Sequence, residues 1–146
     1  MKIRVGVLAA FALAAVVLYQ CLPRAKPRPP ETLAALAPEL SVFFPPSTRL
    51  MAVRRLNGMD DWIGVKVEMS RSDWPAFLSS TSLDSAALTR DGAHLFGPDQ
   101  GVWDPNRHSE LRGGQVVLSG QFRALNVGVA DLGEDRVLVY IVNHGS

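Results

Sequence analysis

The sequence predicts an α+β domain after an N-terminal membrane helix. The domain is an antiparallel sheet of about five strands, in the order ββαβββ, with one helix packed on a face. Segments 62–69 and 122–130 alternate apolar with other residues, which is the period of a half-buried strand. Segment 136–142 is apolar on both faces, which indicates a central strand or one covered by a helix. Segment 73–80 carries apolar residues at helical spacing.

Residues 1–22 are expected to be a membrane anchor or export signal. Two cations precede a run of fifteen uncharged residues, Val5–Tyr19. We favour an uncleaved anchor over 5–22, because a helix of this length spans about 27 Å, enough for a thin bilayer. The alternatives are a lipoprotein modified at Cys21 and a secreted protein, and the bulky residues before Cys21 argue against the first. The export-signal shape predicts a single-pass protein of the bacterial inner membrane, with its domain in the periplasm.

A proline-rich linker, residues 23–30, follows the anchor. Its sequence PRAKPRPP holds four prolines and three cations, so it neither forms a helix nor pairs in a sheet. As an extended spacer it would reach about 25 Å. Residues 1–30 hold five of the fifteen Lys and Arg and none of the fourteen Asp and Glu, so residues 31–146 carry a net charge of −4. This acidic single domain argues against nucleic-acid binding.

The domain begins with a short helix or turn and a hairpin. Residues 31–40 have leucines at helical spacing, but Pro38 limits the helix. Segments 48–56 and 62–69 flank an Asn-Gly turn signal, which predicts an antiparallel hairpin. In the second of these strands, Lys66 falls on the face predicted to be polar.

The helix and the remaining strands follow in order. Ser72 is the expected N-cap of helix 73–80. A long loop rich in Gly, Pro, Asp and Asn covers 91–114, after a short helical turn within 83–88. The chain then returns to strands at 115–119, 122–130 and 136–142.

The 91–114 loop carries the candidate site residues. His94, Asp104 and His108 are candidates for metal ligation or acid–base chemistry, but their spacing matches no known ligand pattern, so we expect no metal and no cofactor. Phosphate-binding glycine loops and a nucleophile elbow are absent from the sequence. Trp103 is a candidate partner or ligand contact, although we expect it to anchor the loop in the core. Asp104, by bonding a backbone amide, and Pro105 would then turn the chain outward.

Three short runs carry a resemblance: Asp73–Leu78, Trp103–Pro105 and Arg136–Ile141. They resemble a group of small bacterial envelope proteins with an N-terminal apolar segment, to which no activity is assigned. The resemblance implies an envelope protein and carries over no catalytic or binding residue.

The expected function is that of a membrane-tethered, non-enzymatic envelope domain acting through contacts with another protein. One alternative is a toxin-neutralising, immunity-type protein that meets a basic toxin with its acidic domain. The other is a hydrolase or metal-dependent enzyme using the 91–114 loop.

Overall fold

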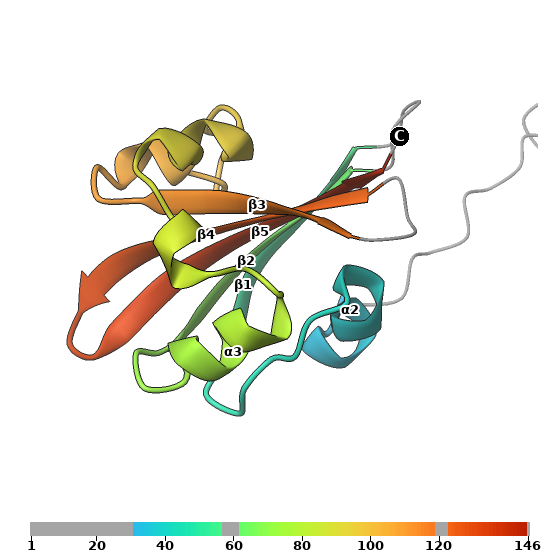
Figure 1. Cartoon of the computed structure of the whole chain (residues 1–146), viewed down its shortest axis with the longest axis horizontal. Helices are drawn as coiled ribbons and strands as arrows, with labels where there is room; N and C mark the ends of the chain where they lie inside the picture. Colours follow the sequence, from blue (N-terminus) through green and yellow to red (C-terminus); the bar gives the residue numbers. More distant parts are fainter. Residues whose placement is uncertain (1–30, 57–61, 119–122, 146) are drawn as a thin grey trace, which may run out of the picture. The chain divides into compact units, whose positions relative to one another are not determined.

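Five strands pair into one antiparallel sheet in the computed structural model, which describes residues 31–56, 62–118 and 123–145 (Figure 1). The order across the sheet is β1-β2-β5-β4-β3. A β1–β2 hairpin and a β3–β4–β5 meander therefore meet where β2 pairs with β5. The predicted α+β class and the order ββαβββ are confirmed. The strands are β1 Arg49–Leu56, β2 Trp62–Ser70, β3 Arg112–Leu118, β4 Arg123–Gly133 and β5 Arg136–Gly145.

The β4–β5 hairpin is longer than the sequence predicts. The two strands are joined by Glu134 and Asp135, which both have positive φ angles, 47° and 60°. Two successive positive φ angles are those of a type I′ turn, whose twist matches that of the flanking strands. The sequence pattern places the end of β4 at residue 130, because it assigns residues 131–135 to a turn. Pairing nevertheless continues through Asp131 opposite Val137.

Two helices and three short 3₁₀ turns complete the described fold. Helix α2 spans Leu33–Leu40, and helix α3 spans Trp74–Ser80. The 3₁₀ turns are η1 Ser85–Ala87, η2 Asp91–Phe96 and η3 Pro105–Arg107. Ser72 was expected to cap α3, and this is wrong. The capping position is Asp73, without a side-chain capping bond, while the hydroxyl groups of Ser72 and Ser70 bond each other.

Helix α2 is fastened to the edge strand β1 by Arg55. The Arg55 guanidinium binds Glu31 at 2.8 Å and Glu39 at 2.5 Å. The hydroxyl oxygen of Thr32 accepts a hydrogen bond from the backbone N–H of Ala35 and so caps the helix. Glu31, the first described residue, is thus held against β1 by an ion pair.

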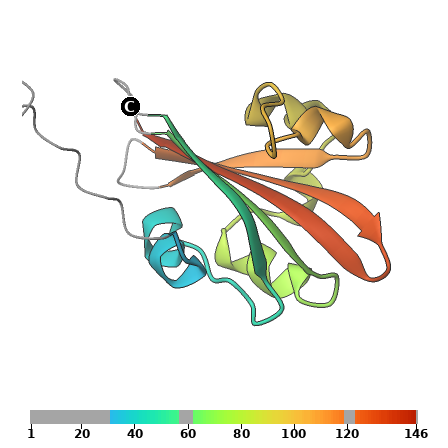
Figure 2. The same cartoon turned by 180° about the vertical axis from the view of Figure 1, so that it is seen from behind.

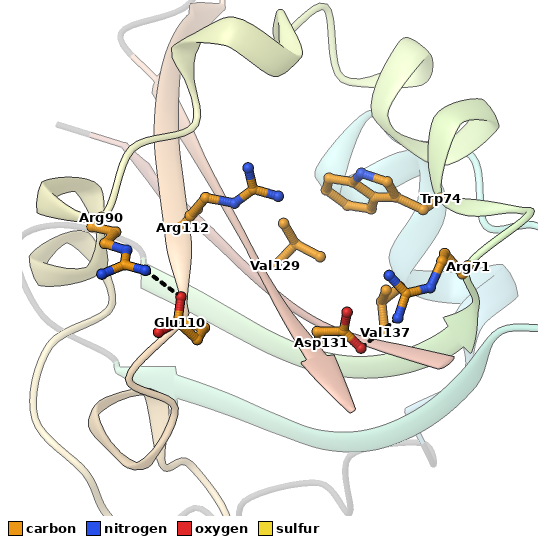
Figure 3. Close-up of a pocket in the computed structure, with 8 residues that line it drawn as sticks. All are labelled: Arg71, Trp74, Arg90, Glu110, Arg112, Val129, Asp131 and Val137. Atoms are coloured by element: carbon orange, nitrogen blue, oxygen red, sulfur yellow. Dashed lines mark hydrogen bonds and ion pairs between the residues drawn. The ribbon is translucent and has the colours of Figure 1, made fainter. Parts of the chain in front are cut away.

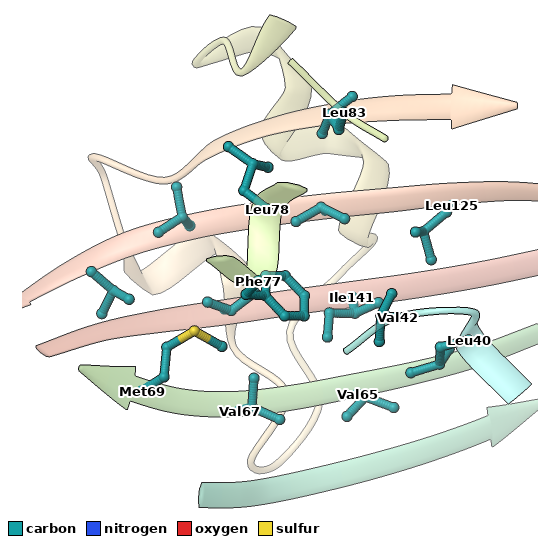
Figure 4. Packing of buried hydrophobic residues seen from close by; sticks show 14 of the residues in the cluster. Leu40, Val42, Val65, Val67, Met69, Phe77, Leu78, Leu83, Leu125 and Ile141 are labelled. Atoms are coloured by element: carbon teal, nitrogen blue, oxygen red, sulfur yellow. The ribbon is translucent and has the colours of Figure 1, made fainter. Parts of the chain in front are cut away.

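One face of the sheet, which we call the first face, is covered by α2 and α3. Phe77 of α3 and Leu36 and Leu40 of α2 are fully buried. They pack against alternating aliphatic side chains of β2, β4 and β5 (Figure 4). These sheet residues are Ile63, Val65, Val67, Met69, Leu125, Val127, Val129, Val137, Val139 and Ile141.

The second face is also covered, by the segment from η2 to the start of β3. Figures 1 and 2 show this segment and the two helices on opposite sides of the sheet. Strand β2 was predicted to be half-buried, and this is wrong: Gly64 is buried and Lys66 is only 8% exposed. The predicted 91–114 loop is therefore shorter than expected: residues 91–111 form a second structural layer that contains η2 and η3, and residues 112–114 belong to β3.

Small residues on the second face create the room for this layer. The Phe96 ring lies against Gly113 and Gly128, and a Cβ atom at either glycine would stand 2.6 Å from that ring. Such a distance is a steric clash, so only glycine lets the ring approach the sheet here. Gly128, which the sequence pattern assigns to the non-core face of its strand, and Gly113, which it assigns to the loop, therefore form the floor of an aromatic core.

The expected anchor (1–22) and linker (23–30) lie outside the described residues, as does the Asn57-Gly58 turn. Within the described ranges, no helix has both the length and the apolar character needed to cross a membrane.

Candidate functional site

Trp103 fastens the 91–114 loop to the second face. Its side chain is 0% exposed, and its indole N–H donates a hydrogen bond of 2.9 Å to the Phe96 carbonyl. Its ring meets the edges of Tyr140 and Trp62 at centroid distances of 5.2 and 5.8 Å. Trp103 is thus buried as expected of an anchor, and in this structure its indole offers no surface to a partner.

Asp104 points into the protein beside Trp103. Its Oδ1 accepts hydrogen bonds from Lys66 Nζ at 2.5 Å and from the Tyr140 hydroxyl at 2.6 Å. Lys66 donates a further bond of 2.9 Å to the Val102 carbonyl. The expectation that Asp104 bonds a backbone amide and turns the chain outward is wrong. The physical reason is the buried ammonium of Lys66, which requires a counter-charge on this face.

Burial and hydrogen bonding shift the pKa values of Asp104, Tyr140 and His108. Burial alone would raise the pKa of Asp104, but the hydrogen bonds from Lys66 and Tyr140 outweigh it and hold that pKa below its usual value. Burial raises the pKa of Tyr140, and its bond to Asp104 raises it further. Burial lowers the pKa of His108, whose Nε2 lies 4.0 Å from Asp104.

The three candidate ligands do not form one set. Asp104 and His108 are neighbours, but His94 turns its Nδ1 to the carbonyl oxygen of Asp91 within its own 3₁₀ turn. The described part of the chain contains no group of three His, Cys, Asp or Glu residues that could hold a metal ion. The groups around Asp104 bind one another, so this arrangement holds the loop on the sheet.

A solvent-accessible hollow of about 490 Å³ lies on the first face, near the β4–β5 turn (Figure 3). Three arginines, two acids, a tryptophan and two valines line it, and they come from segments far apart in the chain. We call it the arginine hollow. Its residues are Arg71, Trp74, Arg90, Glu110, Arg112, Val129, Asp131 and Val137.

Two ion pairs form the rim of the arginine hollow. Arg71 binds Asp131 at 2.5 Å, and Arg90 binds Glu110 at 2.5 Å. Asp131 also accepts a bond of 2.8 Å from the backbone N–H of Gly133. The Arg71 guanidinium, with the Gly133 amide, lowers the pKa of Asp131. Both rim acids thus already have a cationic partner.

Arg112 and Trp74 face the space between these pairs. Figure 3 shows the Arg112 guanidinium and the Trp74 ring on either side of Val129. Arg112 is the cross-strand partner of Val129, which sets its side chain on the first face. Trp74 stacks on Phe77 at a centroid distance of 5.8 Å, which fixes its ring at the wall of the hollow. Trp74 also borders a second hollow, of about 510 Å³, beside α3.

Sequence reasoning missed this site, because it assigned Arg90 to no element and Glu110 and Arg112 to an irregular loop. In the structure Arg112 is the first residue of β3. A signal was present: Arg112, Gly114, Val116 and Leu118 continue the strand's alternation backward onto its core-facing side. Arg112 thus occupies a core-facing position of β3, where its guanidinium lies next to apolar side chains such as Val129.

Comparison of this chain with protein-family models, curated proteins and solved structures finds no match. The resemblance to small bacterial envelope proteins therefore stays an expectation, and the geometry of the domain is the ground for a functional proposal.

Proposed function

We propose that this chain is a membrane-tethered, non-enzymatic domain of the bacterial envelope that contacts a partner protein through the arginine hollow. One observation carries the proposal: the hollow combines the Trp74 ring, stacked on Phe77, with three arginines on the first face near the β4–β5 turn. Tryptophan and arginine are the residue types most enriched where protein interfaces concentrate their binding energy.

A structural role for the 91–114 loop supports a non-enzymatic function. Asp104 is engaged by Lys66 and Tyr140, and Trp103 by the aromatic core. His94 turns toward the backbone of its own 3₁₀ turn. Trp103, Asp104 and His94 are therefore each engaged in contacts within the domain.

The support for a membrane tether comes from the sequence. The uncharged run within 5–22 and the proline-rich spacer 23–30 suit a single-pass anchor in the inner membrane with a periplasmic domain. The arginine hollow has three cations against two acids, which favours an anionic group on the partner. A toxin-neutralising role would instead call for an acidic surface toward a basic toxin.

Photocrosslinking in cells tests both parts of the proposal. A photoreactive residue replaces Arg90 at the rim of the hollow, and in a control it replaces Met51, an exposed residue of the opposite edge strand. We expect a discrete protein adduct from position 90 that is missing from position 51. It should stay with membranes through a high-salt wash and leave with detergent, because hydrophobic insertion does not depend on salt.

Equal adducts at both positions, or none, would contradict a partner contact at the hollow. Release by salt alone, or a soluble shortened chain, would contradict the anchor. A fatty-acid label that disappears in a Cys21→Ser variant would favour the lipoprotein alternative.

A further inference from the structure

The arginine hollow holds one cation that has no acidic partner among the described residues. Arg71 and Arg90 are bound to Asp131 and Glu110, whereas Arg112 makes no ion pair with the part of the chain that the structure describes. The hollow therefore offers a single guanidinium fork to an anion from outside.

The surface beneath Arg112 is apolar. Val129 and Val137 form the floor and are only 6% and 4% exposed. The Trp74 ring, held by its stacking on Phe77, forms a wall. A ligand that places its anionic group on Arg112 would thus lay the atoms next to that group on valine and indole surface.

The acidic residues at the rim of the hollow favour a carboxylate over a phosphate as the bound anion. A phosphate monoester carries nearly two negative charges at neutral pH and needs several donors. Here Asp131 and Glu110 stand beside the one unengaged guanidinium and would repel a second negative charge. A carboxylate carries one charge and has the planar shape that matches a guanidinium fork in a bidentate pair.

We propose that the arginine hollow binds a carboxylate attached to an apolar group, as presented by the C-terminal end of a partner protein whose last residues are apolar. The carboxylate pairs with Arg112, and the apolar side chain lies over Val129 against Trp74. A chain terminus presents this combination, because its carboxylate and its last side chain leave the same Cα atom. The inference rests on the proposed function, since it names the part of the partner that the hollow takes.

A titration of the ¹⁵N-labelled full-length chain in uncharged detergent micelles tests the chemistry. The main probe is an acetylated Ala-Leu-Leu tripeptide with a free carboxylate, and the matched probe is the same peptide with a C-terminal amide. Inorganic phosphate and octanoate are titrated separately. The readouts are the indole N–H signals of Trp62, Trp74 and Trp103, assigned through tryptophan-to-phenylalanine variants.

We expect the acid peptide to shift the Trp74 signal saturably, with a Kd at least tenfold lower than that of the amide. Arg112→Gln should remove this preference, and Arg112→Lys, which keeps the charge without the fork, should retain part of it. The matched control is Arg123→Gln, an exposed arginine of β4 that does not line the hollow; it should leave the Kd unchanged. Unchanged Trp62 and Trp103 signals in each variant show that the fold is intact.

Equal affinity for acid and amide, tighter binding of phosphate than of the peptide, or the same loss in Arg123→Gln would overturn the inference. Binding of octanoate without the peptide would also overturn it, because the ligand would then be a small free acid. The two proposals fail separately. A position-90 crosslink without acid selectivity overturns only this inference, and acid-selective peptide binding without any crosslinked partner overturns only the proposed function.

Discussion

The two faces of the sheet are buried in different ways. On the first face, the helices bring Phe77 and several leucines to an aliphatic sheet surface, and the backbone groups of each helix hydrogen-bond within that helix. On the second face, a segment of short 3₁₀ turns covers Tyr140 and smaller sheet residues. It attaches through the buried rings of Phe96 and Trp103, through Leu111, and through the part-buried Lys66–Asp104 ion pair. The comparison shows that a segment without a long helix can form a structural layer when a few large or charged groups fix it.

A few contacts hold the covering segment on the second face. Lys66 is buried, and Asp104 is the acid with which the structure pairs it. Removing Asp104 should cost up to about 3–5 kcal/mol, the usual figure for a buried pair, because the Lys66 ammonium would stay buried without its counter-charge. The first face spreads its stability over many aliphatic contacts, so single losses there should be smaller unless they introduce a charge.

The largest effect is expected from a charge placed inside the first face. Val139 is fully buried in the central strand β5, and Val139→Asp should abolish folding because an unpaired carboxylate there has no partner. Circular dichroism and thermal unfolding measure this. The matched control is Val117→Asp, because Val117 is 70% exposed on the edge strand β3. A Val139→Asp variant as stable as its parent would contradict the described core.

A smaller and more local effect is expected on the second face. Trp103→Ala should lower the free energy of unfolding by about 3–5 kcal/mol, the usual cost of emptying a large aromatic site. It should also make the 91–111 segment the first site of proteolysis, because the segment loses its anchor. Limited proteolysis with mass spectrometry locates the cuts, and Val102→Ala, at a neighbour that is 65% exposed, is the control. First cuts elsewhere in the Trp103→Ala variant would show that the indole does not hold the layer.

The smallest effect is a pH dependence that belongs to the second face. Burial lowers the pKa of His108, whereas the unfolded chain protonates a histidine at about pH 6.5. As the pH falls below that value, the unfolded state gains a proton that the folded state takes up only at lower pH, so stability falls with pH. Denaturant titrations at several pH values between 7.5 and 5.5 give the free energy of unfolding at each pH. This free energy should fall less steeply with falling pH in His108→Gln than in the parent. If the free energy of unfolding changes equally with pH in both proteins, groups other than His108 cause the pH dependence.

The first face could be predicted from the sequence, and the second could not. The aliphatic alternation of β2 and β4 and the spacing of Trp74, Phe77 and Leu78 are local patterns, and each predicted the right element. Lys66 and Asp104 are separated by 38 positions, and nothing local indicates that one neutralises the other. A lysine in an alternating strand is therefore assigned to solvent until the covering segment is known.

The alternation of β3 marks Arg112, but the rest of the arginine hollow could not be predicted from the sequence, for a related reason. Its lining comes from the turn between β2 and α3, the start of α3, the residue before η2, residues 110–112 and the β4–β5 hairpin, so it exists only after these segments meet. Trp103 could be predicted as an anchor because a large indole in a polar segment has few other uses. Asp104, its neighbour, was misjudged because its partners lie on other strands.

The attachment of Glu31 and Glu39 to Arg55 has a mechanical consequence. If the chain before residue 31 is anchored, any tension along it enters the domain at Glu31 and passes through the Arg55 guanidinium to β1. In the sheet order, β2, β5 and β4 stand between β1 and β3, which carries Arg112. A pull on the tether would thus strain the two carboxylate contacts and peel α2 before it reached the strand at the far edge. With such an anchor, the domain would receive force at the β1 edge of its sheet, whereas Arg112 of the arginine hollow lies on the β3 edge.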